Sequence, residues 1–95
     1  MDYVETILNK LQSLIDDLET LYDKTLTEEY DGDITKVTQS SVLTDEQKAF
    51  LTLGTDINSV RLIYDKIVEN DVVPKTSLIE VNDLYTKYKL SGDVR

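Results

Sequence analysis

Apolar residues in the first part of the chain repeat every seven positions. Three positions of each seven are apolar through three repeats, and the positions between them are mostly polar. The apolar set consists of Val4, Ile7, Leu8, Leu11, Leu14, Ile15, Leu18, Leu21 and Tyr22. This repeat is typical of an amphipathic helix with coiled-coil-like packing, and its stripe is wide enough to meet two neighbouring helices. We predict a helix over about residues 3–25.

A second amphipathic segment follows Thr44, which together with Gln47 has the pattern of a helix-capping box. Apolar residues then recur at spacings of three and four, at Phe50, Leu53, Ile57, Val60, Tyr64 and Ile67. This spacing predicts a helix over about residues 45–69, and its phase runs through Gly54 unbroken. The alternative is a kink or break at Gly54-Thr55-Asp56, because a glycine inside a helix costs about 1 kcal/mol relative to alanine.

Pro74 marks the end of that helix, because the residue before a proline is disfavoured in the helical conformation. Ser77 and Glu80 then form a second capping-box pattern, followed by apolar residues at helical spacing. Ser91-Gly92 closes this segment. The pattern predicts a third helix over about residues 78–90, shorter than the other two.

Between the first two helices, residues 26–43 lose the apolar period. The stretch from Glu28 to Asp33 is acidic and contains Gly32, which could end a helix, and Ile34 to Ser41 is rich in threonine and serine. We predict a mobile acidic, Thr/Ser-rich linker here. The chain as a whole is predicted to be one all-α domain over residues 1–95. It would be either a three-helix bundle or a long helical hairpin with a short third helix.

The short third helix would leave part of the apolar surface of the two long helices uncovered. Exposed apolar surface of this kind usually marks a partner site or a dimer face. We therefore expect a partner protein, or a second copy of the chain, to bind along the first stripe. The candidate partner-binding residues are Val4, Ile7, Leu8, Leu11, Leu14, Ile15, Leu18, Tyr22 and Tyr30.

Tyrosine dominates the aromatic residues, with six tyrosines against one phenylalanine and no tryptophan. The tyrosines on the apolar stripes fit either ordinary packing at the edge of a bundle or an interface, where tyrosine is enriched. Tyr3 and Tyr30 lie off the main stripes. These two are therefore the better candidates for an exposed contact.

The residues that most often carry catalysis are missing, since the chain has neither histidine nor cysteine. It therefore lacks the usual nucleophile activator and the usual zinc ligands. Residues 29–34 resemble the middle of a calcium-binding loop, but threonines stand at positions 27 and 38, where acidic ligands belong. We read this stretch as an acidic turn, and expect no enzyme, no metal and no cofactor.

A net charge of −9 shapes the expected partners. Because binding to phosphates depends on lysine and arginine, direct nucleic-acid binding and attraction to an anionic membrane are not expected. With no signal-peptide pattern, an intracellular, soluble protein is expected. The sequence favours a non-enzymatic protein–protein interaction module. The alternative is a small acidic inhibitor that imitates nucleic acid and blocks a basic protein.

Overall fold

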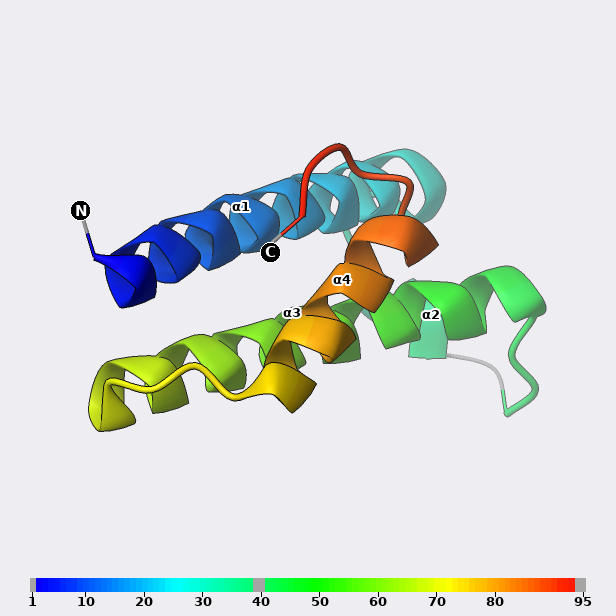
Figure 1. Ribbon diagram of the computed structural model, residues 1–95. Helices are drawn as coiled ribbons and strands as arrows, with labels where there is room; N and C mark the ends of the chain where they lie inside the picture. The colour runs from blue at the N-terminus through cyan, green and yellow to red at the C-terminus, as the bar shows by residue number, and fades with distance from the viewer. Residues whose placement is uncertain (1, 39–40, 94–95) are drawn as a thin grey trace.

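The fold is all-α, as the sequence predicted. A computed structural model of the chain describes residues 2–38 and 41–93, and this part holds four helices and no strand. They are α1 (Tyr3–Tyr30), α2 (Thr35–Thr38), α3 (Asp45–Asn70) and α4 (Lys75–Lys87). In Figure 1, α1 and α3 run side by side in opposite directions, and α4 lies across them. The molecule is elongated, 46 Å along its longest axis, which is close to the length of α1 alone.

Helix α1 begins at the predicted residue, Tyr3. It ends at Tyr30, five residues beyond its predicted end at residue 25. The Asp2 carboxylate caps its first turn by accepting a hydrogen bond from the Glu5 amide at 2.8 Å. The added C-terminal turn is held by Tyr30, whose ring packs against Phe50 of α3. The helix then ends in a left-handed turn, with φ of 54° at Asp31 and 77° at Gly32. Glycine adopts this conformation without strain, so α1 ends at the acidic turn that contains Gly32 and not at the predicted residue 25.

Part of the predicted linker 26–43 is helical, and its mobility stays a prediction. Residues 26–30 belong to α1, and α2 occupies Thr35–Thr38. The Asp33 carboxylate starts this short helix by accepting bonds from the Thr35 amide at 3.0 Å and the Thr35 hydroxyl at 2.7 Å. Val37 anchors the helix because its side chain is fully buried. Residues 39 and 40 lie outside the described part of the chain.

Helix α3 has the predicted start and continues without interruption through Gly54. Both hydrogen bonds of the capping box form: the Gln47 amide donates to the Thr44 hydroxyl oxygen at 3.1 Å, and the Thr44 amide donates to the Gln47 side chain at 2.8 Å. The alternative of a break at Gly54 is not what the structure shows. A Cβ at Gly54 would lie 3.4 Å from the Tyr22 ring, so α1 and α3 approach closely here.

Helix α4 begins three residues before its predicted start. Pro74 precedes its first residue with φ of −66° and ψ of 140°, and no side chain caps the first turn. The predicted capping box at Ser77 and Glu80 is therefore not used as a start signal. Pro74 supplies the start signal instead. The fixed φ of proline suits the entry to a helix, and proline has no amide hydrogen that would lack a partner there.

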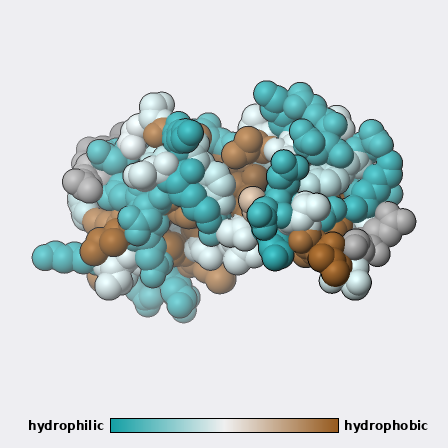
Figure 2. Space-filling view, turned by 90° about the vertical axis from the view of Figure 1, so that its right-hand side faces the viewer, coloured by the Kyte–Doolittle hydropathy of each residue, from teal (hydrophilic) through white to brown (hydrophobic). Residues whose placement is uncertain are grey.

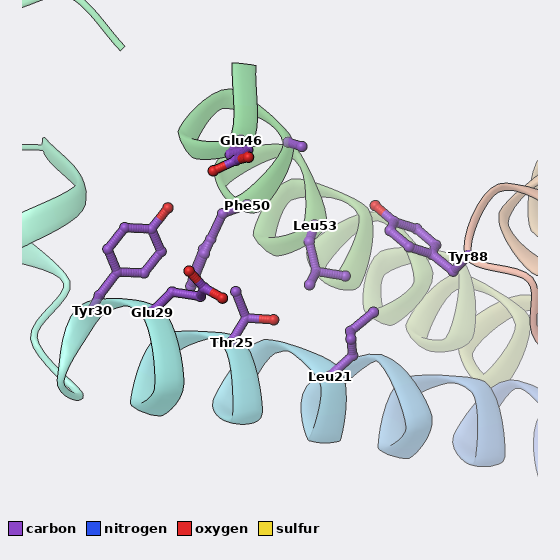
Figure 3. A pocket seen from close by; sticks show the side chains of 9 residues that line it. Leu21, Thr25, Glu29, Tyr30, Glu46, Phe50, Leu53 and Tyr88 are labelled. Carbon is purple, nitrogen blue, oxygen red and sulfur yellow. The ribbon is translucent and has the colours of Figure 1, made fainter. Parts of the chain in front are cut away.

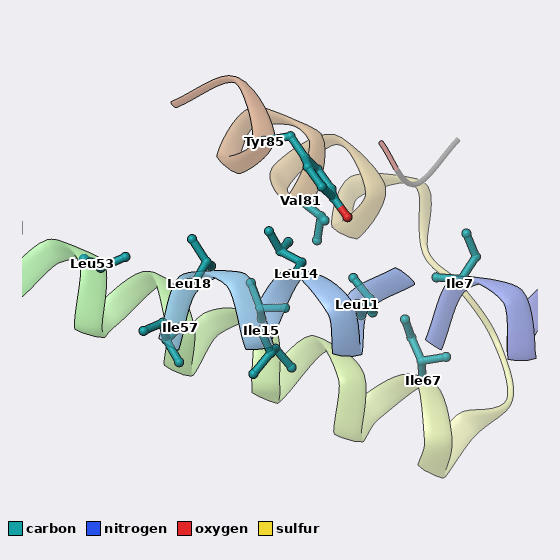
Figure 4. Packing of buried hydrophobic residues seen from close by; sticks show 11 residues of the cluster. Ile7, Leu11, Leu14, Ile15, Leu18, Leu53, Ile57, Ile67, Val81 and Tyr85 are labelled. Atoms are coloured by element: carbon teal, nitrogen blue, oxygen red, sulfur yellow. The ribbon is translucent and has the colours of Figure 1, made fainter. Parts of the chain in front are cut away.

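The core lies where α1, α3 and α4 meet. Figure 4 shows apolar side chains of the two long helices facing each other, with Val81 and Tyr85 of α4 directed onto them. The buried cluster comprises Ile7, Leu11, Leu14, Ile15, Leu18, Leu53, Ile57, Val60, Ile67, Val81 and Tyr85. At its edge, the Tyr85 hydroxyl donates to the Lys10 carbonyl oxygen at 3.5 Å. The ring is thus buried while its polar tip keeps a partner.

At one end of the molecule the surface is mainly hydrophilic, with apolar residues in patches. Figure 2 shows the end of the molecule where α1 ends and α3 begins, and its hydrophobic patches are separated by hydrophilic ones. Among the described residues, no helix is long and apolar enough to cross a membrane.

Candidate partner-binding groove

Helix α4 leaves one end of the pair of long helices open. The uncovered surface forms a groove of about 410 Å³ between the C-terminal half of α1 and the N-terminal half of α3, shown in Figure 3. We call it the α1–α3 groove. Its lining residues are Leu21, Thr25, Glu29, Tyr30, Glu46, Ala49, Phe50, Leu53 and Tyr88. The volume falls in the range of sites that bind small ligands or single side chains of a partner.

Three aromatic rings hold the groove in shape. Phe50 of α3 lies between two tyrosines of α1, with ring centroids 4.5 Å from Tyr22 and 5.2 Å from Tyr30. Both pairs meet edge to face, at interplanar angles of 61° and 81°, which is a favoured geometry for aromatic rings. Phe50 itself is buried. Packing within the chain therefore fixes the floor of the groove.

The walls of the groove combine apolar and acidic side chains. Leu21 of α1 is partly exposed, whereas Leu53 of α3 is buried. Glu29 and Glu46 stand exposed at the edge, one from each long helix, and the lining residues include no lysine or arginine. An apolar floor with an acidic edge results. This arrangement can receive an apolar side chain and attract positive charge beside it.

Tyr88 closes the groove on the side of α4. Its hydroxyl donates a hydrogen bond to the Asp56 carboxylate of α3, and the neighbouring Lys87 ammonium lies 2.8 Å from the same carboxylate oxygen. Burial, together with the Asp56 carboxylate, raises the pKa of the Tyr88 hydroxyl. The last turn of α4 is thereby attached to α3, and this attachment sets where the open part of the groove begins.

The candidate residues from the first stripe lie mainly in the core of the chain itself. Ile7, Leu11, Leu14, Ile15 and Leu18 are buried, and Val4, Leu8 and Tyr22 pack against the same cluster. In this conformation α3 and α4 already cover these side chains. A partner that contacted the five buried side chains would have to separate the helices, so direct binding there stays a prediction. Tyr30 alone of the candidates lines the open groove.

Most residues that line the α1–α3 groove were not among the partner-binding residues that the sequence predicted. The helical spacing had identified Leu21, Phe50 and Leu53 as apolar positions, but not as positions that α4 leaves uncovered. The useful signal was the short third helix, which predicted an open end between the two long helices. Tyr3, the other tyrosine expected to be exposed, has 57% of its surface accessible.

The turn that resembles part of a calcium loop uses its acids within the chain. The Asp31 carboxylate forms an ion pair with Lys36 at 2.6 Å, and this contact raises the pKa of the Lys36 ammonium. The hydroxyl and amide of Thr35 donate to Asp33 and lower the pKa of its carboxyl. Within residues 2–38 and 41–93, no three acidic side chains are grouped so that they could hold a metal ion.

Comparisons of the chain with protein-family models, with curated proteins and with solved structures find no match. The α1–α3 groove is therefore interpreted from its own residues.

Proposed function

We propose that this chain is a non-enzymatic protein-interaction module, a small helical subunit or adaptor. It binds a protein segment in the α1–α3 groove. The observation that carries the proposal is the uncovered apolar groove beside the end of α4, lined by Leu21, Phe50 and Tyr88. Contiguous apolar surface with a polar edge is characteristic of protein-binding sites.

The fixed shape of the groove supports the same proposal. Because Tyr22 and Tyr30 hold Phe50 between them, its ring does not have to be ordered when a partner binds. A preformed site avoids part of the entropy cost of association. The groove also lies at the surface of two long helices, which is where a partner helix can pack by the same rules as a helix of the chain itself.

A photo-crosslinking amino acid placed at position 49 tests the proposal in the native host. Ala49 is exposed, lines the groove and lies on α3, so the replacement points into the site without disturbing the core. The matched control carries the same group at Ser59, an exposed position on α3 outside the groove. We expect a discrete crosslinked polypeptide from position 49 and not from position 59. Identical products from both positions, or none from position 49, would contradict the proposal.

A variant that fills the groove provides the functional counterpart. Ala49→Met adds a flexible apolar side chain at the groove, whereas Ser59→Met adds it elsewhere on the same helix. Both variants should keep the wild-type circular dichroism spectrum and melting temperature. Crosslinking from position 49 identifies the partner, and co-purification without the crosslinking group then measures its binding. Only Ala49→Met should abolish this co-purification.

A further inference from the structure

We infer that the occupant of the α1–α3 groove is a basic amphipathic helix of a partner protein, seated beside the end of α4. This inference rests on the proposed function, because it names the chemistry of the partner for the same groove. It combines three observations: how α4 packs, the charge at the edge of the groove, and the volume of the groove.

Helix α4 shows what kind of element fits on this face. Its inner side chains follow one another at spacings of three and four and pack onto both long helices: Leu78, Val81, Tyr85 and Tyr88. The groove continues the same face beyond Tyr88, which belongs to both the inner face of α4 and the lining of the groove. A second helix placed there would extend the layer that α4 begins. It would need apolar side chains at the same spacing.

The contact between α4 and α3 also shows how charge assists docking on this face. Lys87, at the flank of α4, forms an ion pair with Asp56 of α3 at 2.8 Å. The open groove offers two further acids, Glu29 and Glu46, without a base among its lining residues. Residues 1–43, which include α1, carry ten acidic and three basic side chains. A partner helix with lysine or arginine beside its apolar face would match this surface in charge.

The volume of the groove limits how much of the partner enters. A cavity of about 150 Å³ can hold one benzene-sized group, so 410 Å³ has room for at least two such groups. We therefore expect two large apolar side chains, one helical turn apart, to occupy the groove. The basic residues of the partner would lie on either side of them, near Glu29 and Glu46.

Two synthetic helical peptides of about 18 residues test the inference directly, a length of about five turns. Both carry leucines at spacings of three and four. In one, the remaining positions are mostly lysine, and in the other these lysines are replaced by glutamine. Fluorescence anisotropy with the full chain should show binding of the lysine peptide at least about tenfold tighter at low salt. Ala49→Met should abolish this binding, and Ser59→Met should leave it unchanged.

A matched pair of charge variants locates the electrostatic part of the binding. Glu29 and Glu69 each stand one residue before the end of a long helix, and each helix is followed by a left-handed aspartate. Glu29 lies at the groove, whereas Glu69 lies about 35 Å along α3 from Glu46. Glu29→Gln should weaken binding of the lysine peptide about threefold, and Glu69→Gln should not. The difference should shrink as salt is raised from about 0.02 M to about 0.5 M.

Several outcomes would overturn the inference. Equal binding of the lysine and glutamine peptides, blocked by Ala49→Met, would show that the groove binds helices without selecting charge, and the proposed function would stand. Binding of the lysine peptide that ignores Ala49→Met would show attraction to acidic surface outside the groove. If neither peptide bound, a basic helix would not be the occupant. The crosslink from position 49 would then decide the proposed function separately, including whether the occupant is a second copy of the chain.

Discussion

Asp56 of α3 contacts the end of α4 through two polar groups. Its carboxylate accepts a hydrogen bond from the Tyr88 hydroxyl and forms an ion pair with Lys87, while only 17% of its side chain is exposed. A carboxylate in this position favours the protonated hydroxyl of Tyr88, because a phenolate beside it would bring two negative charges together. The polar part of this attachment therefore includes a hydrogen bond that requires the protonated form of Tyr88.

Alkaline conditions should weaken this attachment. The pKa values of Tyr85 and Tyr88 are raised, chiefly by burial, above the value near 10 that unfolded tyrosine has. Their contribution to stability is complete below about pH 10 and is lost as the pH rises toward the folded-state pKa values. Tyr88→Phe should cost about 1.5–3 kcal/mol near neutral pH, through loss of one hydrogen bond to a carboxylate. It should also lose less stability between about pH 9 and pH 11 than the wild type.

Urea unfolding followed by circular dichroism at a series of pH values measures both effects. Tyr3→Phe is the matched control, because Tyr3 has 57% of its surface exposed, and this variant should follow the wild-type profile. If Tyr88→Phe lost stability with pH as steeply as the wild type, the proposed linkage would be wrong.

Gly54 offers a second prediction at the level of one residue. Gly54→Ala should raise the free energy of unfolding by about 0.5–1 kcal/mol, because alanine is the better helix former and its Cβ would meet Tyr22 at an ordinary contact distance of 3.4 Å. Denaturant titration measures the change. Gly54→Leu is the paired control, in which the longer side chain meets the Tyr22 ring and removes the gain. No gain from alanine would contradict the prediction and would indicate that the contact of its Cβ with the Tyr22 ring offsets the better helix propensity.

Some residues of the groove could be identified from sequence and some could not. Leu21, Phe50 and Leu53 follow from the helical spacing alone, because periodicity reports which positions are apolar. Tyr30 was expected to be exposed, but it packs against Phe50 from the other long helix. That contact joins residues twenty apart in the chain, and no local pattern encodes it.

At the scale of whole elements, the two capping-box patterns had different outcomes. The pattern at Thr44 starts α3 as predicted, whereas the equivalent pattern at Ser77 lies inside α4. The difference comes from Pro74, which begins α4 before Ser77 is reached. A capping motif marks where a helix can start, and a stronger signal upstream can start it earlier.

This difference yields a direct comparison between two similar substitutions. Thr44→Ala should lower the free energy of unfolding by about 1 kcal/mol, because it removes the hydroxyl that accepts from the Gln47 amide at 3.1 Å. Ser77→Ala should change it by less than about 0.5 kcal/mol, since that hydroxyl caps no helix. Thermal and urea denaturation of both variants provide the measurement. Equal losses would contradict the assigned start of α4.

At the scale of the whole molecule, the sequence predicted the three longer helices, their order and their apolar faces, but neither the short helix α2 nor how the helices are placed relative to one another. It predicted that a short third helix would leave an open end between the long helices, and the groove beside Tyr88 lies there. It also proposed the first stripe as a partner surface, but most of that stripe is covered by α3 and α4. Periodicity identifies an apolar face, and only the packing of distant elements determines what covers it.

Shared burial of α1, α3 and α4 predicts that the chain unfolds as one unit. Leu14 of α1 is fully buried in the cluster that joins the three helices, so Leu14→Ala should cost about 2–5 kcal/mol. Leu62→Ala is the matched control on α3, where 61% of the leucine is exposed and the cost should stay below about 0.5 kcal/mol. In Leu14→Ala, the unfolding transitions followed by the far-ultraviolet signal and by the tyrosine signal should shift together. The slope of the free energy of unfolding against denaturant concentration should be unchanged. Separate transitions would instead show that α4 detaches before the two long helices part, and the groove would then lose its Tyr88 wall while its Phe50 floor persisted.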